Sequence, residues 1–177
     1  MFEDYLQDAY DFQQVAREYA RNGDARLARR HFRAAVFCIA SSMEAFVNYI
    51  ADSFSKAKSI PEHEICFLND KALVFSANKG LQEKTEYHQL DDKFRVLMKR
   101  FQGTFDFTGQ TWNRFMKFRK LRDSLVHPRE ADDERPLEEY KKEVSEGLSA
   151  TIEVMNVISQ QIFRQPLRKQ LLDLMPE

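Results

Sequence analysis

An arginine and a histidine close together in the sequence are the residues best suited to chemistry. They occur in the run Arg122-Asp123-Ser124-Leu125-Val126-His127, which Pro128 follows directly. An arginine is a permanent cation whose donors match phosphate oxygens, and a histidine gains or loses a proton near neutral pH. The pair is therefore suited to holding an anionic phosphate while protons are transferred beside it.

The surrounding pattern predicts that both residues lie at the end of a helix. On an ideal helix Arg122 lies about 40° from Phe118, so it borders the apolar face. Because a residue before proline disfavours helical conformation, we expect the chain to leave the helix at His127. This exit could return the imidazole to the guanidinium, and the helix dipole would favour the protonated ring. A simpler interpretation is that His127 caps its helix and Arg122 pairs with a carboxylate.

A basic segment surrounds this pair. Residues 95–129 contain nine Lys or Arg and two acids, whereas residues 130–146 contain eight acids and three bases. The net charge of −1 gives the whole chain no general attraction to nucleic acid. If the protein binds RNA, we therefore expect Lys117, Arg119 and Lys120 to guide the RNA backbone.

The sequence predicts neither a metal site nor a cofactor site. His63 and Cys66 are spaced like metal ligands, but there is no second pair to complete a zinc site. No glycine-rich phosphate loop follows a strand. Cys38 and Cys66 lie in apolar surroundings without a pairing pattern, so we expect two buried free thiols.

Hydrophobic periodicity predicts helices through most of the chain. Apolar residues recur every three or four positions, and only five Gly and five Pro interrupt them. The expected helices cover residues 2–21, 24–56, 83–101, 110–127 and 136–163, with a short amphipathic tail after residue 166. Residues 62–80 predict only irregular or short helical structure, and no segment has the period of two that is typical of a strand. The prediction is one all-α domain over residues 1–177, an up-and-down bundle of four to five main helices with a short C-terminal helix.

The N-terminal segment and the hydropathy predict a cytoplasmic protein. Residues 1–5 lack the basic start and apolar run of a signal peptide. No stretch approaches the ~20 apolar residues that span a bilayer. We therefore expect no membrane partner.

Two segments resemble the HEPN domain family. The family signature begins with an arginine, followed by a polar residue and apolar positions. It ends with a histidine at a helix end, four to six residues after the arginine. The run from Arg122 to His127 fits this signature, with four intervening residues. The run Ser42-Met43-Glu44-Ala45-Phe46-Val47-Asn48 resembles the family's long central helix. The similarity covers about residues 24–163. Asp123 departs from the pattern, because ribonuclease members more often have asparagine there and an acid repels phosphate.

The resemblance implies a metal-independent endoribonuclease that acts as a homodimer on single-stranded RNA, in toxin–antitoxin or defence biology. By position, Arg122 would hold the scissile phosphate and stabilise the transition state, and His127 would serve as general base or acid. The products would be a 2′,3′-cyclic phosphate and a 5′-hydroxyl. Asp123 would orient His127 or pair with Arg122, and Glu44 would complete the polar cluster or form a buried salt bridge to Arg122. An antidote protein would accompany a toxin, and DNA is not expected as a target.

Other HEPN members only bind nucleotides or proteins, so the alternative is a non-catalytic helical protein-interaction module. In that module Arg122 is buried against Glu44 or another acid and His127 only caps its helix. The enzyme instead requires both side chains to be accessible and to face a two-fold partner. A third alternative is a tetratricopeptide-type peptide binder, because residues 19–35 resemble one such helical hairpin, but no second copy follows at a period near 34.

Overall fold

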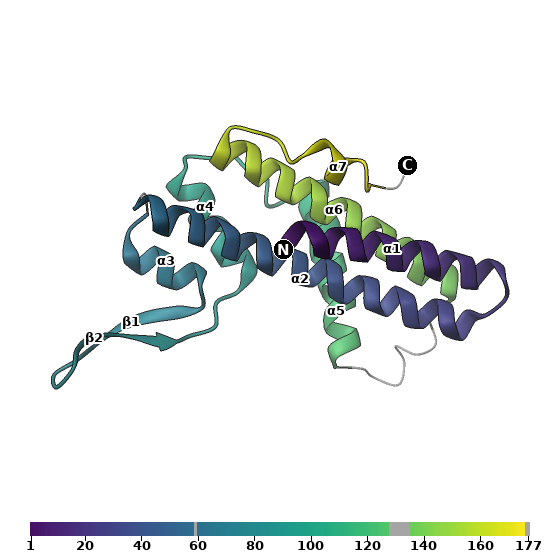
Figure 1. Cartoon of the computed structure of the whole chain (residues 1–177), viewed down its shortest axis with the longest axis horizontal. Helices are drawn as coiled ribbons and strands as arrows, with labels where there is room; N and C mark the ends of the chain where they lie inside the picture. Colours follow the sequence, from purple (N-terminus) through teal and green to yellow (C-terminus); the bar gives the residue numbers. More distant parts are fainter. Residues whose placement is uncertain (59, 128–134, 176–177) are drawn as a thin grey trace.

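The computed structural model describes residues 1–58, 60–127 and 135–175, and most of them are helical. The elements in chain order are α1 (Phe2–Arg21), α2 (Ala25–Ala57), α3 (Glu62–Leu68), β1 (Lys71–Ser76), β2 (Gly80–Thr85), α4 (Leu90–Arg100), α5 (Gln110–Val126), α6 (Leu137–Phe163) and α7 (Lys169–Leu172). The predicted helical character is confirmed. Figure 1 shows α1 and α2 as an antiparallel pair, with α6 and α7 beside them and the two strands extending from one end.

Gly23 and Asp24 form the turn between α1 and α2. Gly23 adopts a φ of +82°, which a glycine reaches without the steric cost of a Cβ. Asp24 then caps α2, since its side chain accepts a hydrogen bond from the Leu27 amide at 2.9 Å. These two residues reverse the chain, so α1 packs along α2.

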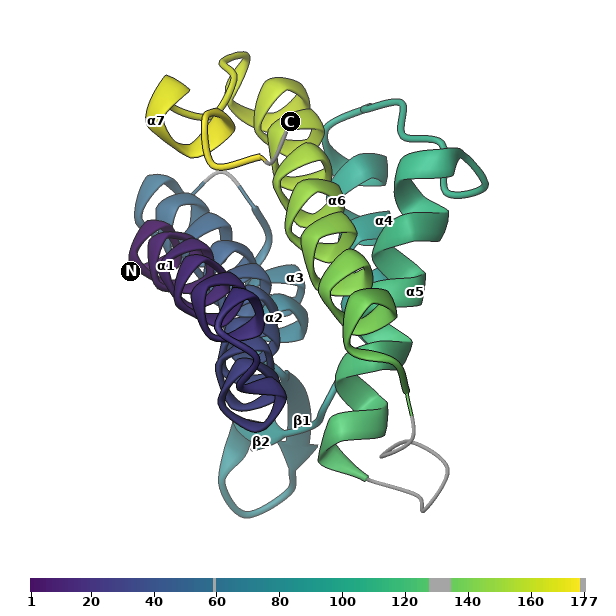
Figure 2. The same cartoon turned by 90° about the vertical axis from the view of Figure 1, so that its right-hand side faces the viewer.

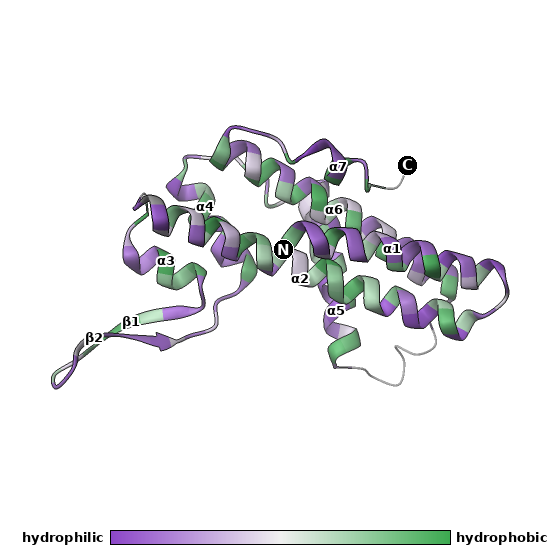
Figure 3. Ribbon diagram, viewed as in Figure 1, coloured by the Kyte–Doolittle hydropathy of each residue, from purple (hydrophilic) through white to green (hydrophobic). Residues whose placement is uncertain are grey.

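Helix α2 is the spine of the fold and contacts α1, α3, α5 and α6. Its apolar residues that recur every three or four positions from Phe32 to Ile50 are buried, and α2 contacts α6, whose apolar face from Tyr140 to Ile162 is also buried. Figure 2 shows α6 between α5 and the α1–α2 pair. Figure 3 shows hydrophobic positions distributed along these helices, whereas β2 is largely hydrophilic.

By length and composition alone, α2 could also cross a membrane. Residues Ala25–Lys56 pass such a test, and half of the most apolar window is buried within the fold. The prediction that no stretch is long and apolar enough was therefore wrong. The core helix of a bundle has the same length and composition, so this property does not distinguish the two roles.

The β-hairpin was not predicted. Its antiparallel register pairs Lys71 with Thr85 and Ser76 with Gly80. A period of two appears when one face of a strand packs on a core, but burial does not alternate along either strand here. The helix predicted from residue 83 consequently begins at Leu90, and Tyr87, which lies within the predicted helix, is exposed.

Aromatic residues pack the region between α4 and α5, as the abundance of Phe suggests. Trp112 is buried on α5, with ring centroids of Phe105, Phe107 and Phe115 at 5.6, 5.0 and 5.3 Å. Phe94 of α4 adds a fourth ring at 6.0 Å. This packing fixes the start of α5 and hence the direction in which its charged end points.

Candidate functional site

Arg122 lies on the wall of a groove between α2 and α5. The groove has a volume of about 680 Å³ and also borders the start of α1 and Leu90 at the start of α4. Its surface is mostly apolar, with Phe37 and Tyr49 from α2 and Phe118 from α5. A concave surface of this size with a few polar groups is typical of a binding site.

The Arg122 guanidinium pairs with the neighbouring acid and remains accessible. Its Nη1 lies 3.1 Å from Asp123 Oδ1, and 34% of the side chain is exposed. Glu44 lines the same groove, but its ion pair is with Lys93, at 3.9 Å. Of the two acids expected near Arg122, Asp123 is therefore the one that pairs with it.

His127 ends α5, as predicted from the following proline. Its φ and ψ are −124° and 67°, and its backbone N–H donates to the Asp123 carbonyl at 2.9 Å. The residue is exposed and does not line the groove, although Val126 does. Among the described residues, no hydrogen bond joins His127 to Arg122, so the single chain does not assemble the pair into one contact. Pro128 lies outside the described residues.

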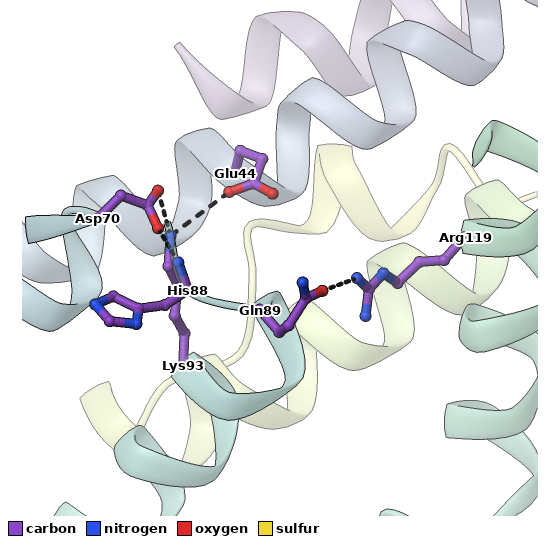
Figure 4. Close-up of polar contacts among 6 residues, drawn as sticks. All are labelled: Glu44, Asp70, His88, Gln89, Lys93 and Arg119. Carbon is purple, nitrogen blue, oxygen red and sulfur yellow. Dashed lines mark hydrogen bonds and ion pairs between the residues drawn. The ribbon is translucent and has the colours of Figure 1, made fainter. Parts of the chain in front are cut away.

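The three basic residues expected to guide RNA have different surroundings. Lys117 is exposed and pairs with Glu143 of α6 at 3.2 Å. Lys120 is exposed on the same helix. Arg119 is mostly enclosed, and it pairs with Asp91 at 3.2 Å. It also donates to the Gln89 side chain at 3.3 Å (Figure 4). Arg119 therefore joins α5 to α4, whereas Lys117 and Lys120 remain accessible to a ligand.

A buried lysine beside the groove was missed by the sequence analysis. The Lys93 side chain is only 1% exposed, and its ammonium donates to Asp70 at 2.8 Å and lies near Glu44 (Figure 4). The available signal was its position in α4, three residues after Leu90 and four before Leu97, close to the apolar face. A lysine there is stable only with a carboxylate partner, and Asp70 is distant in sequence.

Asp70 also holds the start of the β-hairpin. Its carboxylate accepts a hydrogen bond from the His88 amide at 2.8 Å, and its carbonyl accepts one from the Glu86 amide at 2.9 Å. Burial opposes ionisation of Asp70, but the His88 amide and the Lys93 ammonium outweigh it, so its pKa lies below the ordinary value. The charged carboxylate therefore ties both ends of the hairpin to α4.

Neither thiol is activated. Both cysteines are free, with Cys66 buried and Cys38 only partly buried, so the expectation of two buried thiols holds for one of them. Burial raises the pKa of the Cys66 thiol, as does nearby Glu83, and burial together with Asp8 raises that of Cys38. Within the described part of the chain, no group of three His, Cys, Asp or Glu is placed to hold a metal ion.

Comparison with known proteins identified no relative. No model of a protein family, no curated protein and no solved structure matches the chain.

Proposed function

We propose that the protein is a HEPN-like, metal-independent endoribonuclease or RNA-binding protein that acts as a homodimer in the cytoplasm. The observation that supports this proposal is the accessibility of Arg122 in the groove and of His127 at the end of the same helix. The alternative has Arg122 buried against Glu44 or another acid. Glu44 pairs with Lys93, and Arg122 pairs with Asp123 but keeps 34% of its side chain exposed, so burial of Arg122 is less favoured.

In the proposed reaction, Arg122 donates hydrogen bonds to the scissile phosphate and stabilises the charge that develops in the transition state. His127 takes the proton from the ribose 2′-hydroxyl or gives one to the leaving 5′-oxygen. Since one chain supplies one arginine and one histidine, a second copy provides the other half of the acid–base set. The products are a 2′,3′-cyclic phosphate and a 5′-hydroxyl.

Asp123 opposes phosphate binding in this proposal, because its carboxylate already pairs with the Arg122 guanidinium, at 3.1 Å. A phosphate has to displace that carboxylate before it can bind the guanidinium. The exposed Lys117 and Lys120 lie on the same helix and supply attraction to the RNA backbone. Arg119 does not take part, because it is engaged with Asp91 and Gln89.

The second candidate is a protein-interaction module, and the groove itself favours it. Phe37, Tyr49 and Val126 are exposed apolar residues on its wall, and such a patch is typical of a contact surface. Glu44 and Asp52 on the same wall disfavour an RNA backbone. In this module the groove binds a partner or antidote protein and Arg122 contributes an ion pair at its edge.

Cleavage of end-labelled single-stranded RNA in EDTA tests the two candidates. We expect wild type to release cyclic-phosphate ends, and His127→Ala to reduce the rate by about 100-fold or more. His63→Ala is the matched control, since His63 is also exposed but lies on α3. Asp123→Asn should increase RNA affinity by removing the competing carboxylate. No cleavage of several RNAs by a folded wild-type dimer would reject the enzyme in favour of the interaction module.

A further inference from the structure

The end of the molecule formed by the α1–α2 turn is strongly basic. Residues 17–33 contain six arginines, no lysine and two acids; the arginines are Arg17, Arg21, Arg26, Arg29, Arg30 and Arg33. One of the acids, Asp24, already accepts the hydrogen bond that caps α2, and the other, Glu18, is exposed. Positive charge therefore exceeds negative charge threefold in this segment, although the whole chain is close to neutral.

These six arginines lack carboxylate partners within the described part of the chain. None of them forms an ion pair there, whereas each of the three arginines of α5 pairs with a carboxylate. Arg17 donates to the Ser145 hydroxyl at 2.9 Å, and Arg29 donates to the backbone carbonyl of Arg135. The other four are exposed. The segment therefore presents permanent cations to an anion from outside the chain.

Four of the arginines form a stripe along the start of α2. Arg26, Arg29, Arg30 and Arg33 fall within about 100° of the helix circumference, and the stripe is about 10 Å long. Like charges three or four residues apart repel one another, and the positive end of the helix dipole adds to this repulsion, because α2 has no acid in its first turn. A stripe longer than one phosphate group is suited to a chain of phosphates.

A polar cavity between α1 and α6 adjoins the same turn. It has a volume of about 510 Å³, and Arg17, Arg21, Lys141 and Glu138 are among its lining residues. Lys141 pairs with Glu138 at 3.0 Å, so the two arginines give the lining its positive charge. The Arg17 Nε is buried and has no hydrogen-bond partner among the described residues. An unpaired buried donor is costly, so this cavity also favours an anionic acceptor.

Aromatic rings lie among these arginines. The rings of Tyr19 and His31 are nearly parallel, with centroids 5.3 Å apart and an interplanar angle of 10°, and both side chains are partly exposed. Arginines beside aromatic rings are typical of proteins that bind single-stranded nucleic acid, because bases stack on the rings while the guanidinium groups pair with phosphates. A lipid surface is less suited, since no large apolar side chain of residues 17–33 is exposed to enter it.

We propose that the arginine surface, formed by the six arginines of residues 17–33 with Lys141, binds the phosphate backbone of single-stranded RNA. Arginine suits this role because its planar fork donates two hydrogen bonds to one phosphate. The surface contributes more affinity for RNA than α5, where the arginines are paired and Lys117 is engaged with Glu143. This role rests on the proposed function for its ligand but does not require that the RNA is cleaved.

Fluorescence anisotropy with a labelled oligouridine tests the surface. All chains carry His127→Ala and are kept in EDTA, so that no cleavage accompanies binding. The test variant adds Arg26→Gln, Arg30→Gln and Arg33→Gln. The matched control replaces three exposed bases with Gln at the end of the molecule that carries the hairpin, opposite the α1–α2 turn (Figure 1); these are Lys56, Lys79 and Lys84.

We expect the arginine variant to bind at least about tenfold more weakly than its parent at low salt. The slope of log affinity against log salt should fall by about 2, because each phosphate contact on a single strand contributes about 0.7. The control should retain the parent slope, and circular dichroism identifies any variant that fails to fold. A parent chain that binds no RNA, or an arginine variant that binds as tightly as the control, overturns the proposal.

Two competitors test the class of partner. Polyglutamate of matched charge and vesicles rich in phosphatidylserine are added to the complex with labelled RNA. We expect neither to displace the RNA at concentrations where unlabelled RNA does. Equal competition by polyglutamate would assign the surface to an acidic protein, and equal competition by the vesicles would assign it to a membrane. Either result overturns RNA as the partner.

Acids of the chain itself are tested separately. Residues 130–134 contain four acids and lie outside the described residues. Replacing these acids with their amides should leave RNA binding dependent on the arginines, as in the parent. If only the amide variant binds RNA, the arginines serve the acids of their own chain and the proposal is overturned.

Binding and cleavage give separate outcomes. If the arginines are required for binding but the chain with its native His127 cleaves no RNA, the arginine surface stands and the ribonuclease is rejected. If that chain cleaves RNA and neither binding nor cleavage changes in the arginine variant, the ribonuclease stands and the arginine surface is rejected.

Discussion

The helical core buries its apolar residues, whereas the β-hairpin exposes several of its own. In the core, α1, α2 and α6 bury the apolar residues that face one another, and Phe32, Ile39 and Leu148 have no exposed surface. In the hairpin, Phe75 and Leu81 are mostly exposed. Similar residue types therefore have different roles: in the core they stabilise the chain, and in the hairpin they contribute little to a single copy.

The difference shows where the stability of the chain resides. Burying an aliphatic or aromatic side chain contributes about 1.5–3 kcal/mol relative to leaving it exposed. The core residues obtain that contribution on folding, whereas the hairpin residues can obtain it only from a partner. Substitutions in the two regions should therefore have different effects on folding.

The largest expected effect is a truncation in the core. Ile39→Ala removes a fully buried side chain and leaves a cavity between α2 and its neighbours, so we expect the free energy of unfolding to fall by about 3 kcal/mol. Phe75→Ala should change it by less than about 0.5 kcal/mol at concentrations where the chain is monomeric. Urea unfolding at low protein concentration measures both. Equal losses would show that the hairpin residue is buried in the single chain.

The next effect concerns the buried pair at the base of the hairpin. Asp70→Asn leaves the Lys93 ammonium with Glu44 alone, 3.9 Å away, and should lower the free energy of unfolding by about 2 kcal/mol. Adding Lys93→Met removes the buried charge, so the double variant should recover much of that loss. If the double variant is no more stable than Asp70→Asn, the pair is not the source of the effect.

The ion pair between Asp70 and Lys93 also makes the free energy of unfolding depend on pH. The Asp70 pKa in the folded chain lies below its ordinary value of 3.8, so its stabilising contribution is present above pH 3.8. The contribution is lost as the pH falls through the lower, folded-state value. The difference in unfolding free energy between wild type and Asp70→Asn should therefore stay constant from neutral pH to about pH 5 and shrink in more acidic buffer.

The smallest effect tests the contact that positions the helix bearing Arg122. A Cβ at Gly147 of α6 would lie 2.3 Å from the Phe118 ring of α5. Gly147→Ala should cost about 1 kcal/mol, because the clash outweighs the better helix propensity of alanine. Phe118→Ala removes the clashing Cγ and Cδ2 atoms and leaves only Cβ, at 3.2 Å, so in that background Gly147→Ala should become nearly neutral. An equal cost in both backgrounds would place the strain elsewhere.

The helices could be predicted from the sequence because each has one face buried against another. Positions such as Ile39 and Ile152 repeat with the helical period, and both are fully buried. The hairpin gives no corresponding signal, because neither face of β1 or β2 packs on the core. Hydrophobic periodicity records which side of an element faces the interior, so an element that faces solvent, or a second molecule, does not show it.

The candidate site was predictable only in part, for a related reason. The exit of the chain at His127 follows from local geometry, and the position of Arg122 at the edge of an apolar face follows from helical spacing. Arg122 pairs with its neighbour Asp123, but the acids that pair with Lys93 and Arg119 come from distant segments. Glu44 was expected beside Arg122 and pairs with Lys93, which Asp70 binds from 23 residues away.

The packing around Trp112 has a spectroscopic consequence. It is the only tryptophan in the chain, and phenylalanine rings from α4, α5 and the intervening loop surround its buried indole. A polar environment shifts indole emission to longer wavelength. The emission wavelength of Trp112 therefore reports whether α5 packs against α4. Far-ultraviolet dichroism is dominated by the longer helices α1, α2 and α6. The two signals distinguish loosening of the helix that carries Arg122 from unfolding of the whole chain.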